Sequence, residues 1–245
     1  MKTIRWIIAL VLLAILNYFL VLKDFFPTST SESTKDTTKI EIRKSFYDDG
    51  KLKTDAQFVD NKMHGLAHNY YKSGLVHTEM HYVFGVKNGL STWFYPDGKI
   101  YRITPYAGGK ISGIQKKYYK NKKLKAEIPY LHGKLLPGTK EYTEFGKLIS
   151  VYPKIQIKKL DQSHDNGRIL LKVRLSEKVK NLDMKIFLVN GDKHQKVSIA
   201  IDEDGFYNIA FPSVETKKKR HNVLIKAAYK SDRGNKVLIE KSYSV

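Results

Sequence analysis

The sequence predicts a mainly β protein in three parts: an N-terminal transmembrane helix, an array of antiparallel β-hairpin repeats, and a β-sandwich of the immunoglobulin-like or fibronectin-like kind. Three observations lead to this prediction. An apolar run fills most of the first 24 residues, a period of 24 residues governs residues 45–150, and residues 151–245 contain short strand patterns separated by turn residues. The chain has no cysteine, which excludes disulfides and cysteine-ligated metal centres.

Residues 1–24 are predicted to be a transmembrane signal-anchor. Lys2 and Arg5 precede an apolar run that begins at Trp6, and this run gives roughly 25 Å of helix, enough to cross the core of a bilayer. Because the basic residues come first, we expect a single pass through the cytoplasmic (inner) membrane, with the N-terminus in the cytoplasm and the bulk in the periplasm or outside the cell. If the run is instead a cleaved signal peptide, the protein is secreted. Residues 25–44 are rich in Ser and Thr and are expected to be a flexible linker.

Residues 45–150 are an internal repeat. Two turn signals occur in every 24 residues, which predicts one β-hairpin per unit. A single hairpin cannot bury its face, so successive hairpins are expected to add edge to edge in one antiparallel sheet. The positions that keep the period are Gly50, Gly74, Gly98, Lys122 and Gly146; Gly65, Gly89 and Gly113, followed by Pro137; and the aromatic residues Phe58, Tyr82, Tyr106 and Tyr130.

The third unit, Phe94 to Lys117, carries the clearest pattern. It reads Tyr-Pro-Asp-Gly-Lys-Ile, then an aromatic residue, then Gly-Lys-x-x-Gly. This pattern resembles the MORN repeat variant found in bacterial proteins of the YwqK antitoxin type. The fourth unit departs from it at Lys122 and Pro137. The resemblance implies a β-hairpin array used for protein or lipid contacts, without a family active site.

Residues 151–245 lose the period, and their strand patterns recur at the spacing typical of β-sandwiches. Turn clusters such as Asn190-Gly191 and Asp202–Gly205 separate the strands. Seven strands are predicted: Lys154–Lys159, Arg168–Leu175, Met184–Val189, Lys196–Ile201, Phe206–Phe211, Asn222–Lys230 and Lys236–Tyr243.

The candidate binding residues are aromatic and basic positions of the array. Basic side chains interleaved with aromatic ones can hold a polyanion through charge and stacking, although a solvated loop is the simpler interpretation of such a cluster. The candidates are Tyr71, Tyr95, Tyr118, Tyr119, Lys116, Lys117, Lys120 and Lys123. A second basic run is Lys217–Arg220.

Two sets of residues could bind metal ions. If a hairpin turn closes at Gly74, His68 and His77 lie nearly opposite each other, where imidazoles could hold zinc or copper. The default interpretation is that these histidines lie on the surface of a sheet and bind no metal. The acidic run Asp202–Asp204 could supply calcium ligands, but its loop is short and is better explained as a polar hairpin turn. We therefore predict no metal and no cofactor.

The chain is predicted not to be an enzyme. It has no Gly-x-Ser-x-Gly elbow, His-Glu-x-x-His pair, phosphate-binding Walker loop or dinucleotide-binding fingerprint. Its net charge is +20, and the excess of basic over acidic residues is nine in each of the segments 40–150 and 151–245. Nucleic-acid binding is not expected, because a nucleic-acid module usually concentrates its charge on one face.

The predicted function is that of a membrane-anchored, non-catalytic binding or scaffold protein that acts on a protein partner through its repeats. Two alternatives stay open. The basic surface could bind an anionic lipid or an acidic polymer of the cell envelope. The repeats could also serve as an antitoxin-like partner of a toxin, which requires the part after the apolar run to lie in the cytoplasm.

Overall fold

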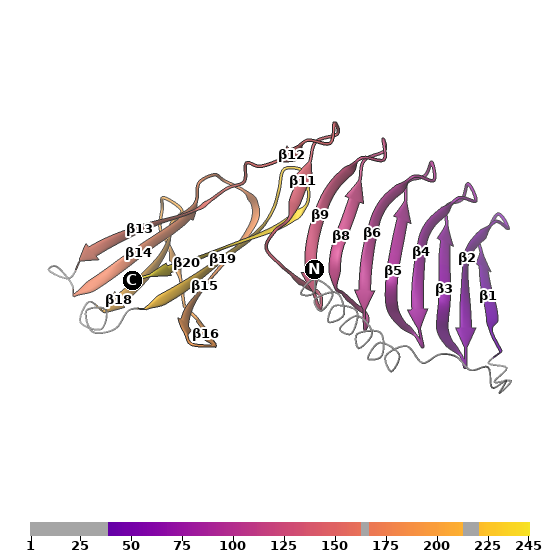
Figure 1. Ribbon diagram of the computed structural model, residues 1–245, viewed down its shortest axis with the longest axis horizontal. Helices are drawn as coiled ribbons and strands as arrows, with labels where there is room; N and C mark the ends of the chain where they lie inside the picture. The colour runs from indigo at the N-terminus through magenta and orange to yellow at the C-terminus, as the bar shows by residue number, and fades with distance from the viewer. Residues whose placement is uncertain (1–38, 163–166, 213–220) are drawn as a thin grey trace, which may run out of the picture. The chain divides into compact units, whose positions relative to one another are not determined.

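The computed structural model describes residues 39–162, 167–212 and 221–245 (Figure 1). In this part of the chain all regular secondary structure is β, and every strand pairing is antiparallel, so the predicted fold class is confirmed to that extent. Residues 39–245 form one compact unit. The predicted transmembrane helix, residues 1–24, lies outside the described residues. Among the residues that are described, no helix is long and apolar enough to span a membrane.

The repeats form a 12-stranded sheet in which consecutive strands are neighbours, with the short strands β7 and β10 paired to β6 and β9. The first strand begins at Glu41, inside the segment expected to be a linker, because β1 pairs with β2 along its whole length. The strands are β1 Glu41–Phe46, β2 Leu52–Val59, β3 Lys62–Tyr70, β4 Val76–Val83, β5 Val86–Phe94, β6 Ile100–Ala107, β7 Lys110–Ile111, β8 Gly113–Tyr118, β9 Leu124–Leu131, β10 Lys134–Leu135, β11 Lys140–Tyr142 and β12 Leu148–Ile149.

The turns at the two ends of the strands differ in conformation. At one end of the strands each turn finishes in a residue with positive φ, as in Tyr95–Gly98, where the Gly98 N–H donates to the Tyr95 carbonyl at 2.9 Å. The fourth of these turns places Lys122 at φ 67°, a conformation that glycine adopts more easily. At the opposite end of the strands both central residues of the turn have positive φ, as in Phe84 (46°) and Gly85 (86°), which matches the twist of a β-hairpin.

Close approach between strands favours glycine at two positions of the second glycine register, Gly65 and Gly113. A side chain at Gly65 would meet the Oε1 atom of Gln57 at 1.9 Å, because that oxygen accepts the backbone N–H of Leu66 at 2.9 Å. At Gly113 a side chain would meet Cγ of Pro105 at 2.9 Å. Both glycines also have positive φ, so two independent constraints favour glycine at these positions.

The C-terminal segment forms two four-stranded sheets, ordered β13-β14-β18-β17 and β16-β15-β19-β20. This is the strand order of an immunoglobulin-type sandwich with one added strand. The predicted strand Lys196–Ile201 is divided between the two sheets, because the chain crosses there with Val197 and Ile199 packed against the core. The strands are β13 Ile155–Gln162, β14 Arg168–Leu175, β15 Lys180–Asn190, β16 Lys193–Lys196, β17 Ala200–Ile201, β18 Tyr207–Pro212, β19 Asn222–Lys230 and β20 Lys236–Ser244.

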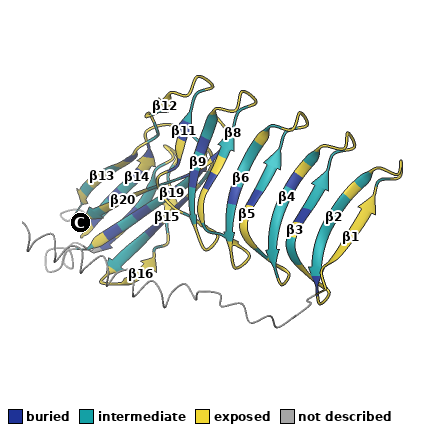
Figure 2. Ribbon diagram, turned by 45° about the vertical axis from the view of Figure 1, so that its right-hand side comes forward, coloured by how far each residue is buried: buried dark blue, intermediate teal, exposed yellow. Residues whose placement is uncertain are grey.

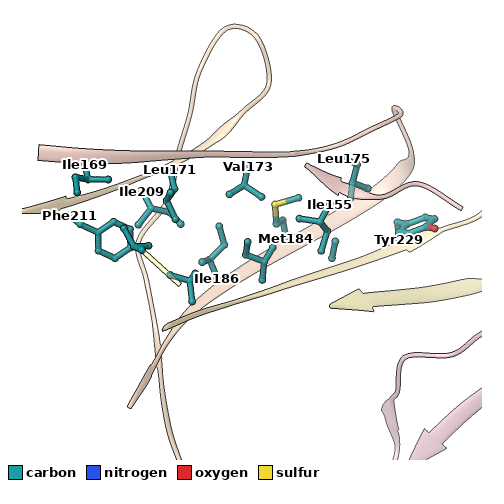
Figure 3. Close-up of a cluster of buried hydrophobic side chains, with 14 of the residues drawn as sticks. Ile155, Ile169, Leu171, Val173, Leu175, Met184, Ile186, Ile209, Phe211 and Tyr229 are labelled. Atoms are coloured by element: carbon teal, nitrogen blue, oxygen red, sulfur yellow. The ribbon is translucent and has the colours of Figure 1, made fainter. Parts of the chain in front are cut away.

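The apolar core of the molecule lies between these two sheets (Figure 3). Alternate residues of β14 and β19 are buried, including Leu171 and Ile225, neither of which has any exposed surface. The array strands differ: most of their residues are of intermediate exposure with single buried positions, and β1 is exposed along its length (Figure 2). The array is therefore a single-layer sheet, while the sandwich is a closed pair of sheets.

Candidate functional site

The array presents two faces, which we name after one residue on each. On the Trp93 face, cross-strand pairing places Thr78, Trp93, Arg102 and Lys117 side by side on consecutive strands. On the Leu90 face, Leu90 is paired with Pro105. The two faces differ because successive side chains of a strand point to opposite sides of the sheet.

The Leu90 face carries a row of exposed aliphatic side chains at intervals of one repeat. Ile42, Leu66, Leu90 and Ile114 are 58, 39, 61 and 51 % exposed. Each is paired on the neighbouring strand with a residue of the same face; the pairs are Ile42 with Gln57, Leu66 with His81, Leu90 with Pro105 and Ile114 with Pro129. We call these four residues the aliphatic row. Gln57 and His81 separate its first members, whereas Pro105 and Pro129 extend the apolar surface around Leu90 and Ile114, where an exposed apolar patch indicates a contact surface.

A row of charged residues runs beside the aliphatic row on the same face. Most cross-strand neighbours in it carry opposite charges or can form a hydrogen bond, which stabilises the sheet locally. At its start, the Nδ1 atom of His68 lies 2.8 Å from the carboxylate of Asp55. The paired positions in order are Lys44, Asp55, His68, Glu79, Thr92, Ile103, Lys116, Glu127 and Lys140. Apolar side chains with a charged row along one side resemble part of a protein-binding surface, in which an apolar centre adjoins a polar rim.

The tyrosines that begin the turns connect one repeat to the next. Burial raises the pKa of the Tyr71 and Tyr95 hydroxyls, so both remain protonated donors. Each hydroxyl donates to a backbone carbonyl 23 residues further along the chain. The bonds are Tyr47 to Tyr70 (2.6 Å), Tyr71 to Phe94 (2.7 Å), Tyr95 to Tyr118 (2.9 Å) and Tyr119 to Tyr142 (2.7 Å). Four candidate binding residues, Tyr71, Tyr95, Tyr118 and Tyr119, thus take part in these inter-repeat bonds, which we call the tyrosine ladder.

The candidate lysines are not gathered on one surface. Lys116 lies on the Leu90 face opposite Glu127, whereas Lys117 lies on the Trp93 face and donates to Oδ1 of Asn235 at 2.9 Å. Lys120 and Lys123 lie in the turn between β8 and β9. Lys120 Nζ is 5.9 Å from the centre of the Tyr95 ring, and Lys123 Nζ donates to the Phe145 carbonyl at 3.3 Å. The alternation of side chains along a strand separates residues that are adjacent in sequence. The second basic run, Lys217–Arg220, lies outside the described residues.

The structure does not bring His68 and His77 together. His68 is paired with Glu79, and its two ring nitrogens face the carboxylates of Asp55 and Glu79 at 2.8 and 3.5 Å. His77 falls at an irregularity of the pairing, next to the Tyr71 ring with 4.5 Å between ring centres. In the part of the chain that the structure describes, no group of three or more His, Cys, Asp or Glu residues is arranged to hold a metal ion.

The acidic run Asp202–Asp204 forms a hairpin turn, as predicted. The Gly205 N–H donates to the Asp202 carbonyl at 2.9 Å, and the Asp202 carboxylate accepts from the Phe206 N–H at 2.8 Å. The same carboxylate lies 2.7 Å from Lys172 Nζ and accepts from Asn208. These bonds, the Lys172 bond first, lower the pKa of Asp202 to about 2.

Sequence analysis missed a buried carboxylate in the last array strand. Glu141 is only 1 % exposed, and it accepts hydrogen bonds from Ser231 Oγ (2.7 Å) and Asn235 Nδ2 in the turn between β19 and β20. Thr139 Oγ1 donates to the Lys236 carbonyl at 3.0 Å nearby. The only sequence signal was the turn composition of Ser231–Asn235, which says nothing about its partner 94 residues earlier. These contacts join the array to the sandwich.

Three segments of the chain match the family model of the MORN repeat variant: residues 42–60, 87–107 and 111–132. The resemblance inferred from the repeat pattern is therefore confirmed for the repeats themselves. No curated protein matches the chain. The matched segments contribute strands β1, β2, β5, β6, β8 and β9, so they include both faces of the array.

Proposed function

We propose that this protein is a membrane-anchored, non-catalytic binding or scaffold protein that docks a protein partner along the Leu90 face of its repeats. MORN repeats often take part in binding and scaffolding, and the family is generally non-catalytic, which supports the proposal. The observation that carries it is the aliphatic row, four exposed apolar side chains at repeat intervals. The N-terminal segment, residues 1–24, would hold the protein in the cytoplasmic membrane with the bulk of the chain outside the cytoplasm.

The energetics of the aliphatic row suit a partner that lies across several repeats. Complete burial of one Leu or Ile side chain contributes about 1.5–3 kcal/mol, and these four are already partly covered. Each therefore adds a modest gain, and specificity requires several repeats to be contacted together. The neighbouring charged row would fix the register of the partner and increase the rate of encounter.

The test replaces the aliphatic row without disturbing the fold. We would compare the full-length chain with the triple variant L66T/L90T/I114T by crosslinking in membranes and co-purification. Threonine is β-branched and favours strands, so the sheet should persist. The expected result is the loss of a discrete crosslinked partner in the variant. Substitution is preferable to deletion of the array, because deletion would remove Glu141 from its bonds to Ser231 and Asn235.

A matched control is available on the same sheet. The variant L75T/I100T/L148T removes three aliphatic side chains of similar exposure (46, 39 and 49 %) outside the row. It should keep the partner. Loss of the partner in both variants, or in neither, would contradict docking along the Leu90 face.

Binding of an anionic lipid or envelope polymer is the second candidate, favoured by the net charge of +20. It requires no protein partner, and its affinity must fall steeply as salt rises. Flotation with phosphatidylglycerol vesicles at about 0.05 and 0.5 M salt distinguishes it from the first. The antitoxin-like role requires a cytoplasmic location, which a topology reporter fused after Val245 would detect.

A further inference from the structure

A cavity of about 800 Å³ lies on the other side of the array, where its Trp93 face meets the sandwich. Strands β6, β8 and β9 contribute one wall, and strands β15, β19 and β20 contribute the other. The cavity is large enough for a small organic ligand.

The charges around this cavity are unbalanced. Four basic side chains line it, Arg102, Lys117, Lys230 and Lys236, against the single carboxylate of Asp183. Asp183 is itself paired with Lys185 at 2.8 Å. Burial lowers the pKa of Lys117, and the nearby positive charges, with Arg102 the largest contributor among them, lower it further. The carboxylate of Glu141, which accepts the bonds from Ser231 and Asn235, opposes this effect on the pKa of Lys117.

Arg102 is held in place yet has an unused donor. Its guanidinium lies 3.8 Å from the centre of the Trp93 ring, a cation–π contact that fixes its orientation. Its Nε atom is buried and has no hydrogen-bond partner among the described residues. A buried N–H without a partner is costly and is rarely left unmade in a folded protein. Because this atom has almost no accessible surface, an anion in the cavity would meet Arg102 through its other guanidinium nitrogens.

Tyr229 borders the cavity, but its side chain belongs to the buried core of the sandwich, on the same face of β19 as Ile225 and Ala227. It is only 5 % exposed, and its hydroxyl has no hydrogen-bond partner within the described part of the chain. Burial is the main cause that raises the pKa of this hydroxyl to about 12, so it stays protonated. The remaining walls include the apolar side chains of Ile111, Ile128 and Leu135. The cavity thus combines a cationic part with an apolar part.

We propose that this cavity binds a phosphate group carried on a partly apolar ligand, with Arg102 and Lys117 as the principal contacts. A phosphate monoester carries close to two negative charges and several acceptor oxygens, which suits the excess of cations better than a single carboxylate does. Arginine presents a fork of donors to phosphate, and lysine adds a mobile point charge. The site is independent of docking along the Leu90 face, because it lies on the opposite face of the array.

The test measures binding of two probes to the full chain purified in a neutral detergent. One probe is inorganic phosphate, titrated by calorimetry at constant ionic strength with chloride as the replacement. The other is short-chain phosphatidic acid in mixed micelles, compared with short-chain phosphatidylcholine. Saturable binding of inorganic phosphate identifies a soluble phosphorylated ligand as the source, whereas binding of phosphatidic acid alone identifies a lipid headgroup. Binding of neither probe would overturn the proposal.

Adjacent lysines provide the matched control. Lys117→Gln and Lys116→Gln change the same strand and the same net charge, but only Lys117 lines the cavity. Lys117→Gln and Arg102→Gln are expected to weaken binding of the responding probe at least tenfold, and Lys116→Gln to change it less than twofold. Equal losses in the Lys116 and Lys117 variants would show a nonspecific charge effect and overturn the proposal.

A second variant distinguishes a loss of ligand binding from a loss of stability. Lys117→Gln removes the bond to Asn235 and could loosen the contact between array and sandwich. Lys230→Gln reduces the charge of the opposite wall while leaving that bond in place. It should weaken binding severalfold with an unchanged thermal midpoint. Unaltered affinity in this variant, together with a lowered midpoint in Lys117→Gln, would also overturn the proposal.

Discussion

The array and the sandwich are both antiparallel β-structure, but different interactions stabilise them. The sandwich buries aliphatic side chains such as Leu171, Ile186 and Ile225 completely between its two sheets. The array has buried positions too, but several are small and polar, such as Ser91 (1 % exposed) and Thr104 (0 %). It relies instead on bonds that recur once per repeat, above all the tyrosine ladder. One region thus concentrates its stability in a core, and the other distributes it along the chain.

The largest expected effect is a loss of core packing in the sandwich. Leu171→Ala should lower the free energy of unfolding by about 2–5 kcal/mol, because it removes a fully buried side chain and leaves a cavity. Hydrogen exchange should locate the loss in β13, β14 and β18. The exposed Leu148 gives the control, since its replacement by Ala should cost less than about 0.5 kcal/mol. Equal losses at both positions would mean that burial does not distinguish the two regions.

A somewhat smaller effect is expected where the two regions are joined. Glu141→Ala should cost about 3 kcal/mol, because Ser231 and Asn235 lose a buried charged acceptor. Chemical denaturation would measure the loss, and exchange should rise in both β11 and the turn that begins at Ser231. The exposed Glu144→Ala variant should be nearly neutral. A loss confined to the array would show that the junction does not couple the two regions.

The array itself should respond in small, equal steps. Each Tyr→Phe change in the tyrosine ladder removes one hydrogen bond and should cost about 1 kcal/mol. The losses at Tyr47, Tyr71 and Tyr95 should add approximately, because each bond spans a different pair of repeats. Equilibrium unfolding followed by Trp93 fluorescence would measure them. A negligible loss for the triple variant would show that the ladder does not stabilise the array.

One substitution should stabilise the array. Lys122 occupies a turn position with φ 67°, where the other units have glycine. Lys122→Gly should raise the free energy of unfolding by about 0.5–1 kcal/mol, since relief of the left-handed strain exceeds the added entropy of the unfolded chain. Thermal unfolding would detect the gain. The reverse change at the equivalent glycine, Gly98→Lys, should destabilise the array; stabilisation there would refute the argument from φ.

The smallest expected effect depends on pH and lies in the sandwich. The pKa of Asp202 is lowered to about 2 in the folded state, so its contribution is present above the ordinary carboxyl pKa and is lost as the pH falls through about 2. Between pH 4 and pH 2 the thermal midpoint of the protein should therefore fall more steeply than that of Asp202→Asn. Parallel curves would mean that the bond between Asp202 and Lys172 does not contribute.

Local patterns predicted the fold well. The array followed from glycines at fixed intervals, because each one supplies a positive φ that a turn requires. Six of the seven predicted sandwich strands have one counterpart each, since alternating apolar residues and polar turns are local signals. The strand Lys196–Ile201 could not be placed correctly, because its division depends on which sheet each half joins.

The site was less predictable, because it depends on contacts between distant residues. The period of Tyr47, Tyr71, Tyr95 and Tyr119 was visible, but nothing local showed that their hydroxyls bind carbonyls of the next repeat. The aliphatic row, Ile42, Leu66, Leu90 and Ile114, has the same period, but the sequence does not show that these side chains are exposed, since aliphatic residues in strands usually form a core. The partnership of Glu141 with Asn235 required the tertiary structure.

The tyrosine ladder has a direction: every hydroxyl donates toward the C-terminus and none toward the N-terminus. During synthesis on the ribosome, the newest repeat would therefore always hold one tyrosine whose acceptor has not yet been made. The series ends without such a vacancy, because the fifth turn begins with Thr143 instead of tyrosine. Each of these bonds can therefore form only after the following unit has been made, and the last one, from Tyr119 to Tyr142, requires the fifth unit.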